Sequence, residues 1–307
     1  MPKINLQKFN LFSGLNNQEL IALDLSTGTL KLVHANSSPN RFEILDLSSR
    51  NIADNEEAEI AKSIRAALGE IKFKNPRIVA VVPAHLVITK NIEIPSTNPH
   101  EIKEIINLQA GRHTPYSREE IIIDYIEIGT YRRSYTKILL VIVARSAVRR
   151  QFQILDKIGI QPEKVLFAPE GVAWAAGRMF NLDTSVFPGC VLNIEESFTD
   201  FAIVFKGKII FIRSVPIGAG HLTAEKDKYR DKFAEEIKRS LEAYQNEDIE
   251  RSPQGVTLSS SAQDLNYLEP LLSETLRLPV KFFPYLKNVP MSSTASRSAS
   301  GIINNVS

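Results

Sequence analysis

The sequence is poor in cysteine, in excess charge and in long apolar runs. Cys190 is the only cysteine among 307 residues, so no intramolecular disulfide can form, and its strand-like surroundings favour a structural thiol in a cytoplasmic protein. The net charge is only +2, which argues against broad nucleic-acid binding because that binding needs a basic stripe. The longest apolar run, residues 138–144, is far shorter than the roughly 20 residues that span a bilayer. These absences predict a soluble protein.

The sequence also lacks the common signatures of enzymes and metal centres. Its five histidines are scattered without the spacing of metal ligands, and no second cysteine or cluster of carboxylates accompanies them. There is no GxSxG turn, no Walker loop and no GxGxxG fingerprint. The usual hydrolase, nucleotide-loop and dinucleotide motifs are therefore excluded as explanations of function.

Enough apolar sequence is present to build a large core. Hydrophobic residues make up 43% of the chain, and a length of 307 residues favours two lobes over one. Residues 1–14 contain apolar side chains without the core of a signal peptide, and we interpret them as an N-terminal arm. Residues 291–307 are rich in Ser, Ala and Asn with little periodicity, which predicts a flexible tail.

The clearest local signals lie between residues 98 and 128. Asn98 is placed to cap a helix that begins at Pro99, and Glu101 is placed to reach back to that cap. Gly111 and Pro115 end the helix, and a β-branched strand follows at residues 121–128. This strand is apolar on both alternating faces, so we expect it to be covered on two sides.

A second signal is a strand-turn-strand unit that occurs twice. Residues 19–35 contain a hydroxyl-rich turn after Asp24, and the unit that starts at Val191 has the same pattern. Taken alone, each unit is an ordinary β-hairpin with polar residues in its turn. The repetition indicates an internal duplication.

The order of these segments resembles the PilM family of actin-like proteins from the type IV pilus inner-membrane platform. The resembling residues are Ile92-Glu93-Ile94-Pro95, Glu101, Ile105, Thr114-Pro115-Tyr116 and Asp124-Tyr125. The resemblance extends from about Leu23 to Leu286. It implies an α/β fold of two actin-like (ribonuclease H-like, duplicated) lobes with an inserted strand-helix-strand-strand subdomain, which the family shares with the cell-division protein FtsA.

The resemblance also divides the chain. It places residues 15–76 and 146–188 in the first lobe, residues 77–145 in the inserted subdomain on that lobe, and residues 189–287 in the second lobe. Residues 1–14 and 288–307 then remain as the arm and the tail.

In an actin-like protein the two turns would hold ATP and Mg²⁺. The residues at the matching positions are Asp24 (which would also orient the metal), Ser26, Thr27, Gly28, Thr29, Lys31, Asn193, Thr199, Ser259 and Ser260.

Three features of these turns depart from the family pattern. Asn193 replaces an aspartate, Glu195 and Glu196 bring negative charge to a turn that should face phosphate, and serines replace the glycines of the adenosine turn at residues 259–261. The segment between Gly220 and Lys232 is also too short for the helical subdomain that grips adenine. We therefore predict weak or lost ATP binding.

The resemblance implies an adaptor that is peripheral at the cytoplasmic face of the inner membrane. Its partner would be a PilN-like single-pass membrane protein, held by its N-terminal tail, and the adaptor would link that protein to the assembly ATPase. The partner site would lie beside the inserted subdomain. Its candidate residues are Ile92, Ile94, Ile102, Ile105, Arg132 and Arg133.

Two alternatives stay open at the level of sequence. An actin-like ATPase or sugar kinase would need the acidic residue and the glycines that are replaced here. The cytoplasmic domain of a type II secretion platform protein resembles PilM and usually continues into a transmembrane helix.

Overall fold

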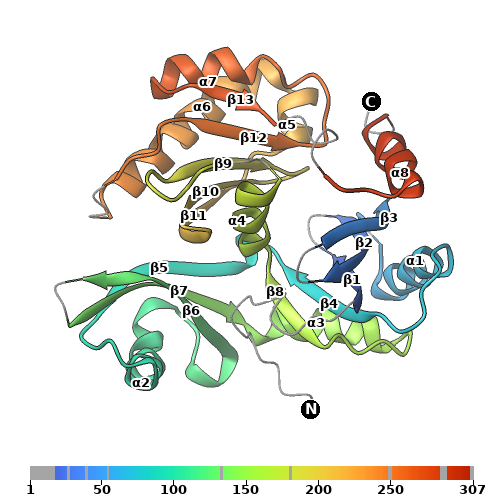
Figure 1. Ribbon diagram of the computed structural model, residues 1–307, viewed down its shortest axis with the longest axis horizontal. Helices are drawn as coiled ribbons and strands as arrows, with labels where there is room; N and C mark the ends of the chain where they lie inside the picture. Colours follow the sequence, from blue (N-terminus) through green and yellow to red (C-terminus); the bar gives the residue numbers. More distant parts are fainter. Residues whose placement is uncertain are drawn as a thin grey trace. The chain divides into compact units, whose positions relative to one another are not determined.

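A computed structural model describes residues 18–25, 28–38, 41–53, 55–131, 134–179, 182–247, 251–283 and 289–304 of the chain. The chain divides into two compact units, one formed by residues 1–83, 145–168 and 285–307 and the other by residues 84–144 and 169–284 (Figure 1). Each unit contains a five-stranded sheet, and the second unit also contains a three-stranded sheet. Within the described ranges no helix is long and apolar enough to cross a membrane.

The five-stranded sheet of the first unit has the strand order β3-β2-β1-β4-β8. Its strands are β1 (Gln18–Asp24), β2 (Thr29–Ser38), β3 (Arg41–Asn51), β4 (Arg77–Val82) and β8 (Lys164–Phe167). The first three strands pair antiparallel, whereas β4 is parallel to β1 and β8 is parallel to β4. The sheet therefore combines a meander with two crossover connections.

The second unit repeats this topology with the order β11-β10-β9-β12-β13. Its strands are β9 (Gly189–Ile194), β10 (Thr199–Phe205), β11 (Lys208–Val215), β12 (Val256–Ser260) and β13 (Val280–Phe282). The pairing directions match those of the first sheet strand for strand. The predicted duplication is confirmed, and the fold is that of a two-lobe actin-like protein.

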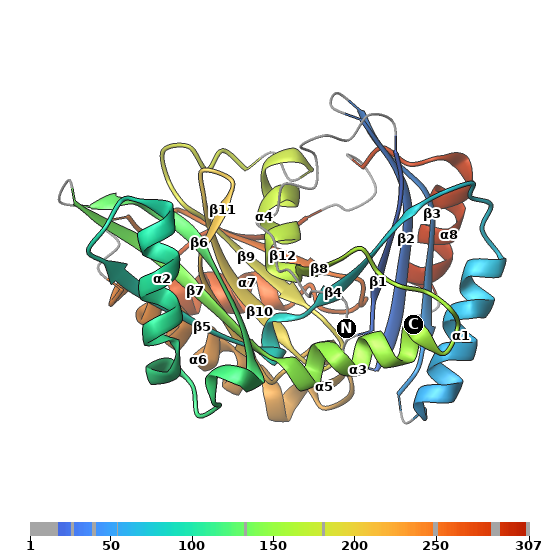
Figure 2. The same cartoon turned by 90° about the horizontal axis from the view of Figure 1, so that it is seen from below.

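The described helices outside the insertion are α1 (Glu57–Gly69), α3 (Arg145–Asp156), α4 (Ala168–Arg178), α5 (Ala219–Ala224), α6 (Lys226–Gln245), α7 (Leu268–Leu276) and α8 (Ser293–Asn304). In the first unit α1 and α3 pack against each other beside the sheet (Figure 2). In the second unit Ile237 and Leu241 of α6 are buried, as their spacing predicts, in a core that also contains Phe201 and Leu272.

The insertion contains β5 (Val87–Ile94), α2 (Pro99–Gln109), β6 (Ile121–Tyr131) and β7 (Tyr135–Ala144), with the strand order β5-β7-β6. Short 3₁₀ turns at Ala84–Leu86, Ala110–His113 and Arg118–Glu120 connect these elements. One face of the sheet packs against Ile102 and Ile106 of α2. The other face packs against β11, where the Thr89 hydroxyl donates to the carbonyl of Ile212 at 3.3 Å. Helix α2 and strand β11 therefore cover the two faces of the sheet that contains the apolar strand β6.

The structure differs from the sequence-based domain boundaries in two places. The resemblance assigns residues 77–82 to the insertion, but these residues form β4, which lies between β1 and β8 and buries Val79, Ala80 and Val82. The insertion therefore begins at Ala84, and it groups with the second lobe because its sheet packs on β11. Residues 169–188 also belong to that unit.

The expectation of an unstructured C-terminal tail is wrong for residues 289–304. Met291 forms a parallel bridge with Ile44 of β3, and the Ser292 hydroxyl donates to the carbonyl of Leu45 at 2.7 Å. Helix α8 follows and buries Ala295 and Ala299. Small side chains gave little hydrophobic periodicity here, although they allow close packing against the edge of the sheet.

The start of α2 confirms one predicted cap and corrects another. The Asn98 side chain accepts a hydrogen bond from the backbone N–H of His100 at 2.9 Å. Glu101 does not reach back to the backbone of Asn98, because its carboxylate accepts from the Ser96 hydroxyl at 2.6 Å. That hydroxyl in turn accepts from the N–H of Asn98 at 3.0 Å, so the helix start is held through Ser96.

Candidate functional site

The turn of the first lobe connects β1 to β2. Asp24 ends β1 and lies opposite Lys31 in the antiparallel register, and both side chains are half-buried. Gly28 has a φ of 76°, and a Cβ at that position would lie 3.1 Å from the Cβ of Ala53. Its carbonyl accepts from the N–H of Ile52 at 2.7 Å. Gly28 is thus required both for the backbone conformation of the turn and for its close packing on the chain before α1.

Two of the predicted phosphate-loop residues, Ser26 and Thr27, lie outside the described residues. Thr29 is the first residue of β2 and is half-buried. The first lobe therefore retains a carboxylate at the end of β1 and a glycine in the following turn. A carboxylate is a usual ligand of hydrated Mg²⁺, so Asp24 is the residue here that would hold the metal.

The turn of the second lobe is closed by hydrogen bonds between side chains. The Ser259 hydroxyl donates to Oδ1 of Asn193 at 3.1 Å, and Nδ2 of Asn193 donates to a carboxylate oxygen of Glu195 at 3.0 Å. The Ser260 hydroxyl donates to the carbonyl of Ile194 at 3.1 Å. The structure thus brings Asn193, Ser259 and Ser260 together, and their polar atoms bind one another and the acidic turn.

Helix α5 closes the same turn from its other side. The N–H groups of Ala219 and Gly220 donate to the carbonyls of Glu195 and Glu196 at 2.8 and 3.0 Å. A Cβ at Gly218 would lie 2.4 Å from the carbonyl oxygen of Glu195, so only glycine fits there. The backbone donors at the start of α5 therefore bind the turn itself.

The predicted contact residue Thr199 is fully buried, and its hydroxyl donates to the carbonyl of Ile217 at 2.7 Å. Next to it, the rings of Phe198 and His85 stack with centroids 4.3 Å apart and planes 6° apart. This stack joins the turn to the start of the insertion. No sequence pattern indicates this stack, because neither residue belongs to a periodic segment.

The chain leaves little room for a helical subdomain on this lobe. Helix α5 ends at Ala224 and α6 begins at Lys226, with Glu225 between them. The described residues also contain no group of three or more His, Cys, Asp or Glu side chains that could hold a metal ion. An anionic triphosphate fits the Glu195–Glu196 turn poorly, because carboxylates and carbonyl oxygens occupy the positions where donors are needed.

The predicted partner-binding residues separate into three groups. Ile94 and Ile102 are buried in the core of the insertion, with exposed fractions of 0% and 1%, so their side chains hold the subdomain together. Ile92 and Ile105 are partly exposed at the edge of that core. Arg132 and Arg133 lie outside the described residues. Helix α2 also presents Leu108 to solvent with 83% of its surface exposed.

Comparison with known proteins places the chain in a family. The sequence profile described as type IV pilus assembly protein PilM matches residues 20–235, from β1 into α6. A solved structure described as the PilM–PilN type IV pilus biogenesis complex is similar with a TM-score of 0.77 at 19% identity, over 95% of this chain and 100% of that chain. The cytoplasmic domain of EpsL, an inner-membrane component of the type II secretion system of Vibrio cholerae, is similar with a TM-score of 0.50 at 11% identity, over 95% of this chain and 96% of that one. Since the profile covers well over half of its length, this chain belongs to the PilM family of type IV pilus assembly proteins.

Proposed function

We propose that the protein is a cytoplasmic adaptor of a type IV pilus assembly platform, peripheral at the inner membrane, that binds the N-terminal tail of a PilN-like single-pass membrane protein and links it to the assembly ATPase. The observation that carries this proposal is the PilM profile match over residues 20–235, which includes the whole insertion. The solved relative described as a PilM–PilN complex supports a partner of this kind.

We place the tail beside the insertion, near Ile92 and Ile105. Both side chains are apolar and partly exposed, and Ile92 lies on β5, which is an edge strand of the sheet. An edge strand offers backbone donors and acceptors to an extended peptide, while neighbouring apolar side chains provide the specificity. A membrane protein's short cytoplasmic tail could pair in this way without folding by itself.

Binding of synthetic peptides tests the proposal. The peptides copy the N-terminal tails of the host's single-pass platform proteins, and calorimetry measures their affinity. Ile92→Glu and Ile105→Glu should each abolish binding, because a charge at a partly buried contact must be desolvated without a partner. Leu108→Glu on the same helix is the matched control, since Leu108 is almost fully exposed. Circular dichroism checks that each variant is folded, and full affinity in folded Ile92→Glu and Ile105→Glu proteins would move the site elsewhere.

We further propose that the adaptor works without nucleotide hydrolysis. The support is the set of contacts around Asn193 and Glu195, in which the chain's own donors already bind the groups of the second turn. The alternative, an actin-like ATPase or kinase, is supported by the Asp24 and Gly28 turn alone.

A further inference from the structure

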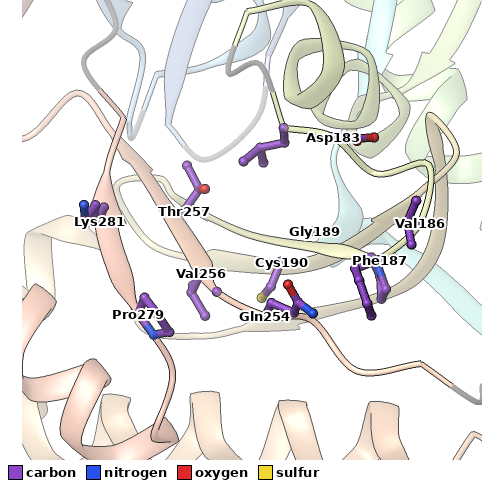
Figure 3. Close-up of a pocket in the computed structure, with 13 residues that line it drawn as sticks. Asp183, Val186, Phe187, Gly189, Cys190, Gln254, Val256, Thr257, Pro279 and Lys281 are labelled. Atoms are coloured by element: carbon purple, nitrogen blue, oxygen red, sulfur yellow. The ribbon is translucent and has the colours of Figure 1, made fainter.

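A pocket of about 430 Å³ lies in the second lobe where β9, β12 and β13 begin (Figure 3). It is lined by Leu182, Asp183, Val186, Phe187, Pro188, Gly189, Cys190, Gln254, Gly255, Val256, Thr257, Pro279 and Lys281. The turn that contains Glu195 follows the opposite end of β9. None of the residues that line the pocket is a predicted phosphate-loop residue or belongs to the insertion.

The loop before β9 presents unusually exposed apolar side chains at this pocket. Val186 and Phe187 expose 55% and 46% of their surfaces, and both line the pocket. An exposed aromatic residue beside a pocket is typical of a protein-binding surface, where such residues supply much of the affinity.

Hydrogen bonds hold this loop in place. The guanidinium of Arg251 donates to the carbonyl of Val186 at 2.6 Å, and the N–H of Lys206 donates to the carbonyl of Thr184 at 2.8 Å. Within the loop, one carboxylate oxygen of Asp183 accepts from both the N–H and the hydroxyl of Ser185. The apolar side chains are thus presented on an ordered backbone, which lowers the entropic cost of binding a partner.

Three cationic residues line the pocket or bind the loop: Lys281, Lys206 and Arg251. Lys281 lines the pocket, and Lys206 and Arg251 flank the ring of Phe205 at 5.2 and 5.3 Å from its centroid. In the part of the chain that the structure describes, none of these three cations forms an ion pair with an acidic side chain. Asp183 is the one acidic residue in the lining, and its carboxylate is already bound by Ser185.

From the ordered apolar loop, the pocket and the surrounding cations we propose that this surface binds an acidic-apolar segment of a protein partner. A Leu or Phe side chain of the segment enters the pocket against Val186 and Phe187. The Asp or Glu residues next to that side chain in the partner segment face Lys281, Lys206 and Arg251. Complementary charge of this kind determines which partner is selected and how fast it associates.

A short fluorescein-labelled peptide in which Leu and Phe alternate with Asp and Glu serves as the probe. Its binding is measured by fluorescence anisotropy and compared with that of the same peptide carrying Lys in place of the acidic residues. Phe187→Asp and Lys281→Glu should each weaken binding of the acidic peptide by about tenfold or more. Lys281→Glu should also improve binding of the lysine peptide.

Two substitutions outside the pocket are the matched controls. Lys238→Glu reverses an exposed charge on α6, and Leu108→Asp removes an exposed apolar side chain from α2, so both should leave binding of the acidic peptide unchanged. Equal binding of the two peptides to the native protein, no binding of either, or no effect of Lys281→Glu would overturn the proposal. Sedimentation that shows a dimer, lost on Phe187→Asp, would also overturn it and identify a second copy of this chain as the occupant.

Discussion

Asn193 lies between two partners of opposite hydrogen-bonding character. Its amide oxygen accepts from Ser259, and its amide nitrogen donates to Glu195. An aspartate, which the family pattern has at this position, could satisfy Ser259 but would place a second carboxylate against Glu195. The asparagine and the acidic turn are therefore a matched pair in this chain.

Asn193→Asp should consequently lower the free energy of unfolding by about 1 to 3 kcal/mol, through the lost donor and the repulsion between carboxylates. Urea denaturation measures the change. Adding Glu195→Gln to Asn193→Asp should restore most of the stability, because the new amide can donate to the aspartate. A double variant as unstable as the single one would show that the Asn193–Glu195 contact is not the cause.

His34 is a buried histidine on β2, and its protonation should weaken the first lobe. Burial lowers the pKa of His34, and the nearby carboxylates of Glu19 and Asp46 only partly oppose that effect. A lowered pKa in the folded state means that the unfolded chain binds the proton more tightly, so stability falls as the pH drops below about 6.5.

The pH dependence of unfolding tests this expectation. Between about pH 8 and pH 5 the native protein should lose stability, and His34→Gln should lose less. The pKa of Glu19 is also lowered, mainly by a hydrogen bond from the N–H of Lys74. Protonation of Glu19 therefore also destabilises the folded protein, but it does so at a more acidic pH than protonation of His34. Parallel curves for the two proteins above pH 5 would contradict the assignment to His34.

At the scale of elements, local sequence patterns indicate the start of α2, strand β6 and the repeated hairpins, but they do not place elements whose position depends on tertiary contacts. The Asn98 cap of α2 follows from local hydrogen bonding. The assignment of β4 to the insertion was wrong, because an apolar run does not reveal which sheet it joins. Helix α8 was missed because its buried residues are alanines, which carry little hydrophobic signal.

The packing of α8 leads to a prediction for the first lobe. Ala295 is fully buried, whereas the adjacent Thr294 is exposed. Ala295→Glu should destabilise α8 by about 3 kcal/mol, because a carboxylate must be buried or the helix must leave the sheet. Thr294→Glu should have little effect.

Hydrogen exchange locates the damage. In Ala295→Glu the amide of Ile44, which donates to the carbonyl of Pro290, should exchange faster than in the native protein. The second lobe should keep its exchange rates. Unchanged protection of β3 in this variant would mean that α8 is not needed to cover that edge.

For the whole molecule, the duplication could be predicted because the same hairpin pattern occurs twice. The hydrogen-bond partners of the phosphate-loop residues could not be predicted. The resemblance to the family implies that Asn193 stands in place of an aspartate and that serines stand in place of glycines at residues 259–261. The structure adds that α5 binds the Glu195–Glu196 turn through its own N–H groups and that Gly218 permits this close approach. Such closure depends on contacts between segments about 20 residues apart, which no local pattern reports.

Mg·ATP and the partner's N-terminal peptide should differ in their effect on the global stability of the protein. A ligand that binds only the folded protein adds RT ln(1 + [L]/Kd), which is about 2.7 kcal/mol at 100 times Kd and about 0.4 kcal/mol at Kd. We expect Mg·ATP to leave the melting temperature almost unchanged. The carboxylates of the second turn repel its phosphates, and the N–H groups at the start of α5 already donate to the carbonyls of that turn. The partner's N-terminal peptide, by contrast, should raise the melting temperature in proportion to the logarithm of its concentration. A substantial increase with Mg·ATP that is lost in Asp24→Ala would show that nucleotide binds through the first turn, and it would restore the ATPase alternative.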